Sequence, residues 1–266
     1  MTRDTSPNTT TSPMDDRGIS EVLSFILVFS MLLVSVGVVG LVGFQSIGDY
    51  QDVEQLGNAE RAMDAFADNA NDVVRYDGVT RRSGDLALRG GTVSPGDSGS
   101  EVNNLTVYNS TSDPVWNWSD EYDENIGAFT YETDSETIAY EGGGVFRSSD
   151  DGGSAVTTDP MLTCRENTAL VSLVKINSSD DRSIQSPDGV EFDVRESENA
   201  TTREYFNDTE NVTIDVDGEH ADGWEMYFEN TNDPWEPDPN SDGWKCEVDR
   251  VSIDIVEVEI GYPGLD

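Results

Sequence analysis

The chain has 266 residues and a net charge of −39, from 54 acidic against 15 basic residues. This excess of acid argues against nucleic acid as a partner, because binding to phosphates needs a basic surface. Aromatic residues make up 9% of the sequence, which argues against a disordered chain and for a folded body. We expect that body to work at very high salt, where screening weakens the repulsion between like charges.

The first predicted element is a long apolar helix. Val22–Phe44 carries no charged residue and would span about 34 Å as a helix, enough for a hydrocarbon core of about 30 Å. The apolar region of a secretory signal is shorter, about 7–15 residues. We therefore predict a transmembrane helix over 19–47. Arg17 lies at its near end, so the orientation rule predicts a cytoplasmic leader, 1–18, and an extracellular C-terminal part.

The residues at the start of this helix carry a family resemblance. Arg17-Gly18 stands directly before Ile19-Ser20-Glu21, which resembles the class III signal of archaeal type IV pilins and archaellins. The segment 138–147, IAYEGGGVFR, resembles one in a largely uncharacterised family of haloarchaeal pilin-like surface proteins. In pilins a prepilin peptidase cuts after the glycine. The resemblance implies cleavage between Gly18 and Ile19, and a mature helix that packs in the core of a filament.

Small residues and one acid within the helix are candidate assembly residues. Gly37, Gly40 and Gly43 recur every third residue, and small residues let helices approach closely in lipid. Ordinary glycine usage in a membrane helix is the alternative. Placing the carboxylate of Glu21 at the start of a membrane helix costs free energy unless the carboxylate is paired or lies at the interface. Cleavage would free the amine of Ile19 for Glu21 to neutralise, whereas in an uncleaved anchor Glu21 would be an acid at headgroup level.

An amphipathic pattern follows in 48–78, where apolar residues recur at three- and four-residue steps. Such spacing predicts a helix, and Gly78 suits the position after its end. We predict that this helix continues the transmembrane helix outside the membrane; a separate juxtamembrane helix is the alternative. The apolar positions are Val53, Leu56, Ala59, Met63, Phe66, Ala70, Val73 and Val74.

The rest of the chain, 79–266, predicts an extracellular acidic β-rich domain. Short alternating or β-branched runs between turn residues favour an antiparallel sandwich or meander. In the last run the alternation slips between Ile255 and Val256, which predicts a bulge or bend, and the glycines 142–144 predict a tight hairpin. The predicted strands are 86–93, 104–109, 127–133, 137–147, 169–176, 189–196, 211–217, 223–230 and 248–262. The predicted fold class is α+β, a long transmembrane-plus-amphipathic helix followed by this β-rich head.

Cysteine usage and sequons fit an exported domain. Cys164 and Cys246 are the only cysteines, and two cysteines in an exported domain usually pair; two reduced buried thiols are the alternative. Asn-x-Ser/Thr triplets are acceptors for N-glycosylation, and the resemblance adds that archaeal pilins and archaellins are frequently glycosylated. We expect at least one to carry a glycan. The candidates are Asn104, Asn109, Asn117, Asn177, Asn199, Asn207 and Asn211.

Motifs for chemistry are weak. One segment matches parts of a calcium loop, although its Asp at the last position and its internal proline favour a plain turn. His220 is the only histidine, which argues against a catalytic triad and against a zinc site with several histidines. We interpret His220 as a solvated side chain in a polar turn. We expect no enzyme, no catalytic residue and no cofactor. The weak calcium candidates are Asp238, Asn240, Asp242 and Asp249.

Together these patterns predict a pilin-like, membrane-anchored cell-surface protein. The expected role is a minor or tip subunit of a type IV pilus-like filament that serves adhesion or surface interaction. Its expected partners are the membrane, the prepilin peptidase and other pilin-like subunits. The alternative is a monomeric, single-pass anchored ectodomain that binds a ligand or partner at the cell surface. Cleavage after Gly18 distinguishes the two, because a plain anchor needs none.

Overall fold

The computed structural model describes most of the chain after the first fifteen residues. Only the backbone is described for 16–19, 42–53 and 198–200, and most of the predicted leader lies outside the described residues. The chain divides into two compact units, 1–54 and 55–266. The described residues are 16–76, 78–86, 90–96, 99–133, 135–150, 152–177, 182–185 and 189–263. An apolar N-terminal helix and a β-rich body confirm the α+β class in these broad terms.

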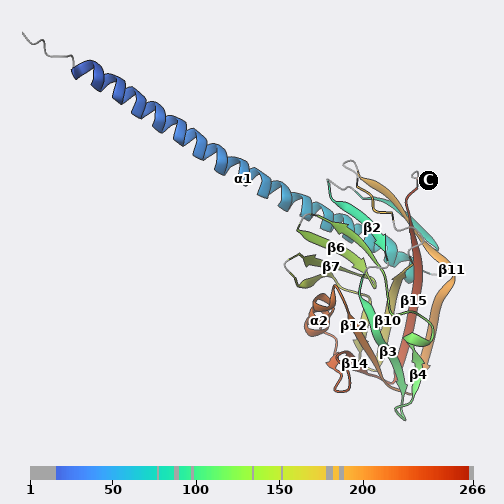
Figure 1. The fold of residues 1–266 in the computed structure, drawn as a ribbon. Helices are drawn as coiled ribbons and strands as arrows, with labels where there is room; N and C mark the ends of the chain where they lie inside the picture. The colour runs from blue at the N-terminus through green and yellow to red at the C-terminus, as the bar shows by residue number, and fades with distance from the viewer. Residues whose placement is uncertain are drawn as a thin grey trace, which may run out of the picture. The chain divides into compact units, whose positions relative to one another are not determined.

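The N-terminal helix α1 (Asp16–Arg75) is one continuous helix, as predicted for the apolar and amphipathic stretches together (Figure 1). Gly78 follows its end with φ +84°, a conformation that costs glycine little. The second unit begins at Gln55. The part of α1 from Gln55 to Arg75, roughly six turns at about 3.6 residues per turn, therefore belongs to the same compact unit as the strands.

Among the described residues, the strands form three five-stranded sheets. The first sheet has the order β1 (Arg81–Leu86), β11 (Val190–Asn207), β15 (Arg250–Gly261), β10 (Thr168–Ile176) and β9 (Leu162–Arg165). The second has the order β13 (Glu236–Pro237), β14 (Trp244–Glu247), β12 (Thr209–Asp217), β3 (Glu101–Asn109) and β4 (Pro114–Asn117). The third has the order β2 (Thr92–Gly96), β5 (Ala128–Glu132), β6 (Glu136–Glu141), β7 (Gly144–Ser149) and β8 (Ser154–Thr158).

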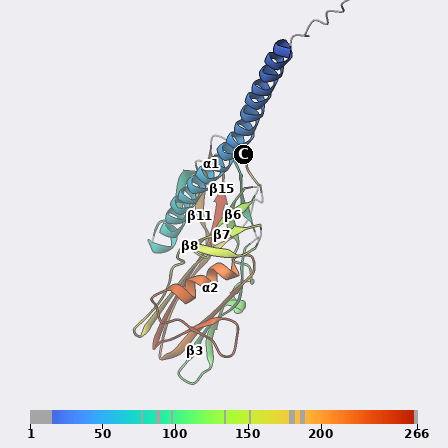
Figure 2. The ribbon, with the colours of Figure 1, turned by 90° about the vertical axis from the view of Figure 1, so that its left-hand side faces the viewer.

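Two hydrophobic cores lie on either side of the first sheet. The first core joins that sheet to the third sheet and to the second half of α1. Phe66 of α1 is its centre, because its ring lies 4.3 Å from that of Phe129, 4.8 Å from Phe192 and 5.3 Å from Tyr140 between centroids. The second core joins the first sheet to the second sheet and to a short helix, α2 (Ala221–Asn230), which lies beside β8 (Figure 2).

The predicted slip in the last strand marks the boundary between the two cores. In β15, Ile255 belongs to the second core and Val256 to the first, so both neighbours are buried. Its partner β10 changes face at the same level, between Leu173 and Val174. The pairing of β15 with β11 is irregular nearby, between Glu196 and Thr201. The predicted bulge is not in β15, which pairs with β10 in continuous register across Ile255 and Val256. The extra residues are on β11, and the slip in β15 reflects the change from one core to the other.

Three strand predictions were wrong. The segment 86–93 is not one strand, because β1 ends at Leu86 and β2 begins at Thr92. The segment 223–230 is the helix α2, since Trp224, Tyr227 and Phe228 are its buried residues and their spacing is helical. The strands were predicted to be antiparallel throughout, but β10 and β15 pair in parallel. Between them the chain passes through the second sheet, and this long connection lets β15 run in the same direction as β10. The predicted hairpin at 142–144 is the β6–β7 turn.

A short 3-10 helix, η1 (Trp118–Asp120), completes the described secondary structure. Asn117 caps it by accepting a hydrogen bond from the backbone N–H of Ser119 at 3.0 Å. The indole of Trp118 is buried and packs on Tyr122, with ring centroids 4.6 Å apart. The loop after η1 is held against the end of β10 by a hydrogen bond from the backbone N–H of Ile176 to the Ile126 carbonyl at 2.8 Å.

Candidate functional site

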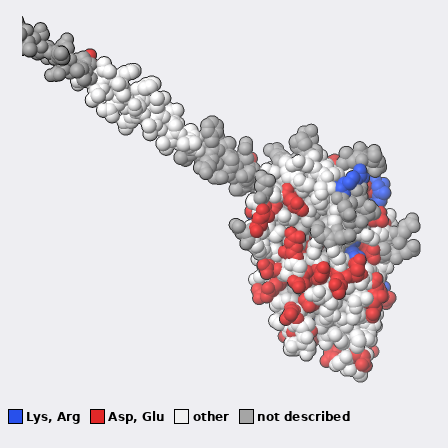
Figure 3. Space-filling view, viewed as in Figure 1, with Lys and Arg blue, Asp and Glu red and all other residues white. Residues whose placement is uncertain are grey.

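The first candidate is the exposed apolar part of α1. Ser20–Leu41 is long and apolar enough to cross a membrane, with a mean hydropathy of 2.8, and the protein's own fold buries none of it. Its large apolar side chains are all exposed, up to 76% at Met31 and Leu41. Figure 3 shows this segment almost entirely free of acid and base, with red at its start, where the sequence has Glu21, whereas red acidic side chains spread over the face of the β-rich body. Such a surface needs an apolar environment.

The predicted assembly residues lie along this segment. A Cβ added at Gly37 or at Gly40 would meet nothing within 4 Å, so both positions offer open space to another helix. Glu21 is exposed, and the side-chain surroundings of position 43 lie outside the described residues. The packing role of these residues, and the pairing of Glu21 with the amine of Ile19, stay predictions.

The predicted cleavage position lies in the first turn of α1. The helix begins at Asp16, so Gly18 and Ile19 have helical backbone, and only the backbone is described for both and for Arg17. The N–H groups of a first helical turn lack partners within the helix, which makes this end the easiest to open for a peptidase. Cleavage itself stays a prediction.

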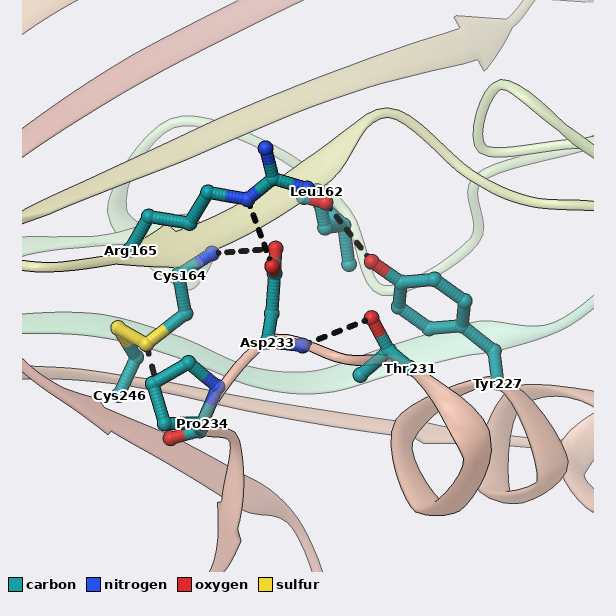
Figure 4. Close-up of polar contacts among 8 residues, drawn as sticks. All are labelled: Leu162, Cys164, Arg165, Tyr227, Thr231, Asp233, Pro234 and Cys246. Atoms are coloured by element: carbon teal, nitrogen blue, oxygen red, sulfur yellow. Dashed lines mark hydrogen bonds and ion pairs between the residues drawn. A yellow bond between two sulfur atoms is a disulfide. The ribbon is translucent and has the colours of Figure 1, made fainter.

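The predicted disulfide is confirmed. Cys164 of β9 and Cys246 of β14 are bonded, so the bond ties the first sheet to the second across the second core. Sequence reasoning missed the buried Asp233 beside it, which accepts hydrogen bonds from the backbone N–H of Cys164 at 3.0 Å and from Arg165 Nε at 2.8 Å (Figure 4). Nearby, the Tyr227 hydroxyl donates to the Leu162 carbonyl at 2.8 Å. All these contacts hold structure together and leave no reactive thiol.

The calcium candidates are not brought together. Asp238 accepts hydrogen bonds within its own turn, from the backbone N–H of Asn240 at 3.1 Å and from the Ser241 hydroxyl at 2.9 Å. Asp249 instead accepts one from Asn167 Nδ2 at 2.8 Å. In the part of the chain that the structure describes, no group of three or more acidic, histidine or cysteine side chains could hold a metal ion. The hydrogen bonds of Asp238 are those of a turn.

The sequons differ in accessibility. Asn104 is held on the second sheet, where its Nδ2 donates to Thr213 Oγ1 at 2.9 Å and its Oδ1 accepts from Thr106 Oγ1 at 2.6 Å. The Oδ1 of Asn211 is buried without a hydrogen-bond partner. In the folded state the amide of Asn104 is engaged in these hydrogen bonds and the Oδ1 of Asn211 is buried. Glycosylation at either position stays a prediction.

Four other sequons reach the surface. Asn177 and Asn207 are exposed, and Asn109 and Asn117 are half-buried. In the latter two, the side-chain Oδ1 accepts a hydrogen bond from the hydroxyl of the sequon's own third residue, Thr111 at 2.8 Å and Ser119 at 3.1 Å. The side chain of Asn199 lies outside the described residues. Glycosylation at any of them stays a prediction.

His220 was assigned wrongly as a solvated side chain. It is completely buried, and its Nδ1 lies 2.9 Å from Oε2 of the equally buried Glu141. Glu141 also accepts hydrogen bonds from the Ser100 hydroxyl at 2.6 Å and from Trp224 Nε1 at 2.7 Å. The cluster joins the β6–β7 hairpin to the start of α2. Glu141 lies inside the 138–147 segment, but nothing in the local sequence reveals a partner 79 residues away.

The charges of this pair stabilise each other. Burial raises the pKa of Glu141, but its hydrogen bonds with His220, Ser100 and Trp224 and the charge of His220 outweigh it and lower the pKa overall. Burial lowers the pKa of His220, but the hydrogen bond and charge of Glu141 raise it overall. Because the carboxylate lies between the serine and the histidine, the serine has no base to activate it. The cluster is therefore a buried structural network.

Among the cavities lined by described residues, two on the β-rich body are large enough to hold a small molecule. One of about 520 Å³ lies between β12, α2 and β14, and carries acids without any basic residue in its lining. Burial, followed by the charges of Asp242 and Asp217, raises the pKa of Asp215 there. The other, of about 370 Å³, lies beside the end of β10 and contains Lys175. The lining of the larger cavity contains several acidic residues close together, whereas the lining of the smaller cavity contains acidic residues and one lysine.

Comparison with known proteins gives one family. A model described as a family of unknown function (DUF7289) matches residues 17–261. No curated protein and no solved structure matches the chain. The matched range begins at Arg17, the basic residue before the predicted cleavage position, and includes both the apolar helix and the β-rich body. The family model thus covers the two parts together.

Proposed function

We propose that this chain, which belongs to the family of unknown function DUF7289, is a pilin-like, single-pass membrane protein of the cell surface. In this proposal the apolar half of α1 lies in the membrane and the acidic β-rich body lies outside the cell. The protein serves as a minor or tip subunit of a filament that takes part in adhesion or surface interaction.

The exposed segment Ser20–Leu41 carries this proposal. It is the only segment of the described residues that is long and apolar enough to span a membrane, and it belongs to the same helix whose second half is core of the β-rich body. A cleavable secretory signal would be lost from the mature protein. A helix that also builds the core of the body is suited to stay, as the class III signal resemblance implies.

A monomeric anchored ectodomain is the second candidate. The same helix would serve it, and the cavities of the body would then supply the binding site. The two candidates differ at Gly18, because only a pilin-like subunit is processed there. The residues that resemble the class III signal lie within the range that the family model matches, so the same test can be applied to any member of the family.

N-terminal mass analysis tests the proposal. The intact protein, isolated from its own membranes, is compared with a Gly18→Val variant and with a Gly37→Val control whose change lies within the helix. We expect a mature chain that starts at Ile19 in the parent and the control, and an uncleaved chain in the Gly18→Val variant. A chain that keeps its leader in all three would contradict the pilin-like function and leave the anchored ectodomain.

A further inference from the structure

Part of the first sheet exposes the face that lies opposite the second core. The strand register sets Leu170 of β10, Ser252 of β15 and Tyr205 of β11 side by side in one row on this face. Leu170 is 45% exposed and Tyr205 is 56% exposed. We call this surface the open sheet face; its large or charged side chains are Arg165, Leu170, Arg203, Tyr205, Arg250 and Asp254.

Basic side chains gather on the open sheet face. Three arginines and one acid lie there, in a chain that has 15 basic and 54 acidic residues. Arg165 forms an ion pair with Asp233 at the edge of the sheet, and Arg203 forms one with Asp254. Arg250 is exposed, and among the residues that the structure describes its guanidinium has no hydrogen bond or ion pair. A guanidinium binds a carboxylate through two parallel hydrogen bonds, so Arg250 is suited to an acidic partner.

The exposed side of α2 has the opposite character. Asp222, Glu225 and Glu229 recur at three- and four-residue steps and are exposed on one side of the helix. Met226 lies among them and is 42% exposed. The same three acids line the larger cavity of about 520 Å³, whose lining also includes Trp244 and no basic residue. A guanidinium in this cavity can pair with a carboxylate and stack on the tryptophan ring.

The two surfaces lie on different sides of the second core. α2 buries Trp224 and Phe228 in that core, so its acidic side faces away from it. The first sheet packs on the same core with the face opposite to the open sheet face. In Figure 1, α2 lies on the left of the body and β11, which carries Tyr205, lies on the right. One molecule therefore cannot join its own two surfaces, but two molecules can.

We propose that the open sheet face of one copy of the chain binds the acidic side of α2 in a second copy. In this contact Arg250 enters the larger cavity of the second copy and pairs with Glu225, while Leu170 packs on Met226. Because the two surfaces differ, each bound copy keeps one surface free for a further neighbour, and the contact extends as an open row or closes as a ring. It lies on the body, so it is separate from any packing of the apolar helix.

The conditions favour another copy as the occupant. At high salt the attraction between distant charges is screened, so a partner needs ion pairs at contact distance together with apolar contact. The acidic side of α2 offers both. Surfaces this small bind weakly on their own, but copies anchored in one membrane meet at a raised effective concentration. The inference rests on the proposed function only for this anchoring.

Cross-linking of the full chain in its own membranes tests the contact. One chain carries both Leu170→Cys and Met226→Cys, and a short bis-maleimide joins cysteines that lie close together; the native pair is bonded and does not react. We expect a ladder of dimers, trimers and longer products from this double variant, and only monomer from each single variant. Val115→Cys with Met226→Cys is the matched control and should give no ladder, since Val115 is 43% exposed but lies on β4 of the second sheet.

Charge reversal separates specific pairing from chance collision. In the double cysteine variant, Arg250→Glu should lower the yield of the ladder about tenfold, as for the loss of one charge-assisted contact. Adding Glu225→Arg to the same chain exchanges the signs of the pair and should restore the ladder. Arg61→Glu, which reverses an exposed base of α1, is the control and should leave the yield unchanged. Each variant must keep the parent's Tm, so that unfolding does not explain a loss.

Three outcomes would overturn the inference. Monomer alone from the double cysteine variant, in protein that starts at Ile19, would show that the body makes no such contact and would leave the proposed function standing. Dimers from either single variant would show that like surfaces meet. Cross-links to a different protein alone would make that protein the occupant. A ladder from a chain that keeps its leader would instead support the contact and contradict the pilin-like function.

Discussion

At the scale of single residues, the buried network of Glu141 and His220 contains side chains that are common in catalytic sites but that serve a structural role here. A carboxylate, a histidine and a serine meet in a closed interior, but the carboxylate takes every hydrogen bond. The network instead fixes α2 to the β6–β7 hairpin. Removing one partner of such a pair leaves the other buried and uncompensated, which typically costs about 3–5 kcal/mol.

The network predicts a pH window for stability. The lowered pKa of Glu141 means that its contribution is present at neutral pH and is lost as the pH falls through that lowered value. The raised pKa of His220 means that its contribution is present in acid and is lost as the pH rises through that raised value. The pair therefore stabilises the fold most between the two pKa values, with losses on both sides.

Urea unfolding from acid to alkaline pH measures this window. We expect His220→Gln to lower the free energy of unfolding most inside the window and to flatten its pH dependence. Asp120→Asn, an exposed acid of η1, is the control and should keep the parent's profile. Equal losses at every pH would show that His220 contributes by packing alone, and would contradict the role of the ion pair.

At the scale of elements, α1 is both the apolar segment and the centre of a core. Its residues from Ala59 to Val74 supply one face of the first core, so the strands lack a closed core without them. The amphipathic stripe in the sequence predicts this burial. The stripe does not reveal which strands cover it, because those partners come from β5, β6 and β11, far along the chain.

Phe66 tests the core role of the helix. We expect Phe66→Ala to lower the free energy of unfolding by about 3–5 kcal/mol, since a fully buried ring that packs on three others leaves a cavity. Asp68→Ala, on the exposed side of the same helix, should change it by less than about 0.5 kcal/mol. Chemical denaturation of both variants measures these changes. A similarly small loss of unfolding free energy in both would mean that the helix is only loosely packed.

The same elements show where sequence prediction succeeds and fails. The slip in the apolar alternation between Ile255 and Val256 is a local pattern, so it can be read from the sequence. It marks the boundary between the two cores. The spacing of Trp224 and Phe228 fits both a strand and a helix, so the local sequence is ambiguous. The segment is a helix because these side chains are buried against β8 and the disulfide-linked strands. The parallel β10–β15 pair and the contact between Glu141 and His220 depend on long-range topology, which no local pattern contains. The cavity beside Lys175 could not be predicted for the same reason.

At the scale of the whole molecule, one covalent bond ties the first and second sheets. Cys164 and Cys246 are 82 residues apart, and closing a loop of that length stabilises the folded state by about 4–5 kcal/mol in the chain-entropy model. We expect Cys164→Ala with Cys246→Ala to lower the free energy of unfolding by up to that amount. Urea unfolding under oxidising conditions measures it, and reductant should destabilise the parent and leave the double variant unchanged.

Charge acts on the whole body as well. With a net charge of −39, the compact state suffers self-repulsion, which salt relieves because the Debye length falls from about 10 Å at 0.1 M to about 3 Å at 1 M. We expect Tm to rise steeply between these concentrations. A Tm that is flat or falls with added salt would contradict the prediction that the fold is adapted to high salt.

The larger cavity offers a local test of the same repulsion. Burial and the charges of Asp242 and Asp217 raise the pKa of Asp215, so its ionised form costs stability above that pKa. Asp215→Asn should therefore raise Tm at 0.1 M salt and pH 7, and raise it less at 1 M salt, where neighbouring charges are screened. Asp120→Asn, whose residue lines neither cavity, should show a smaller difference between the two salts. If both variants gain equally, the repulsion is spread over the whole surface, and the cavity is no special concentration of charge.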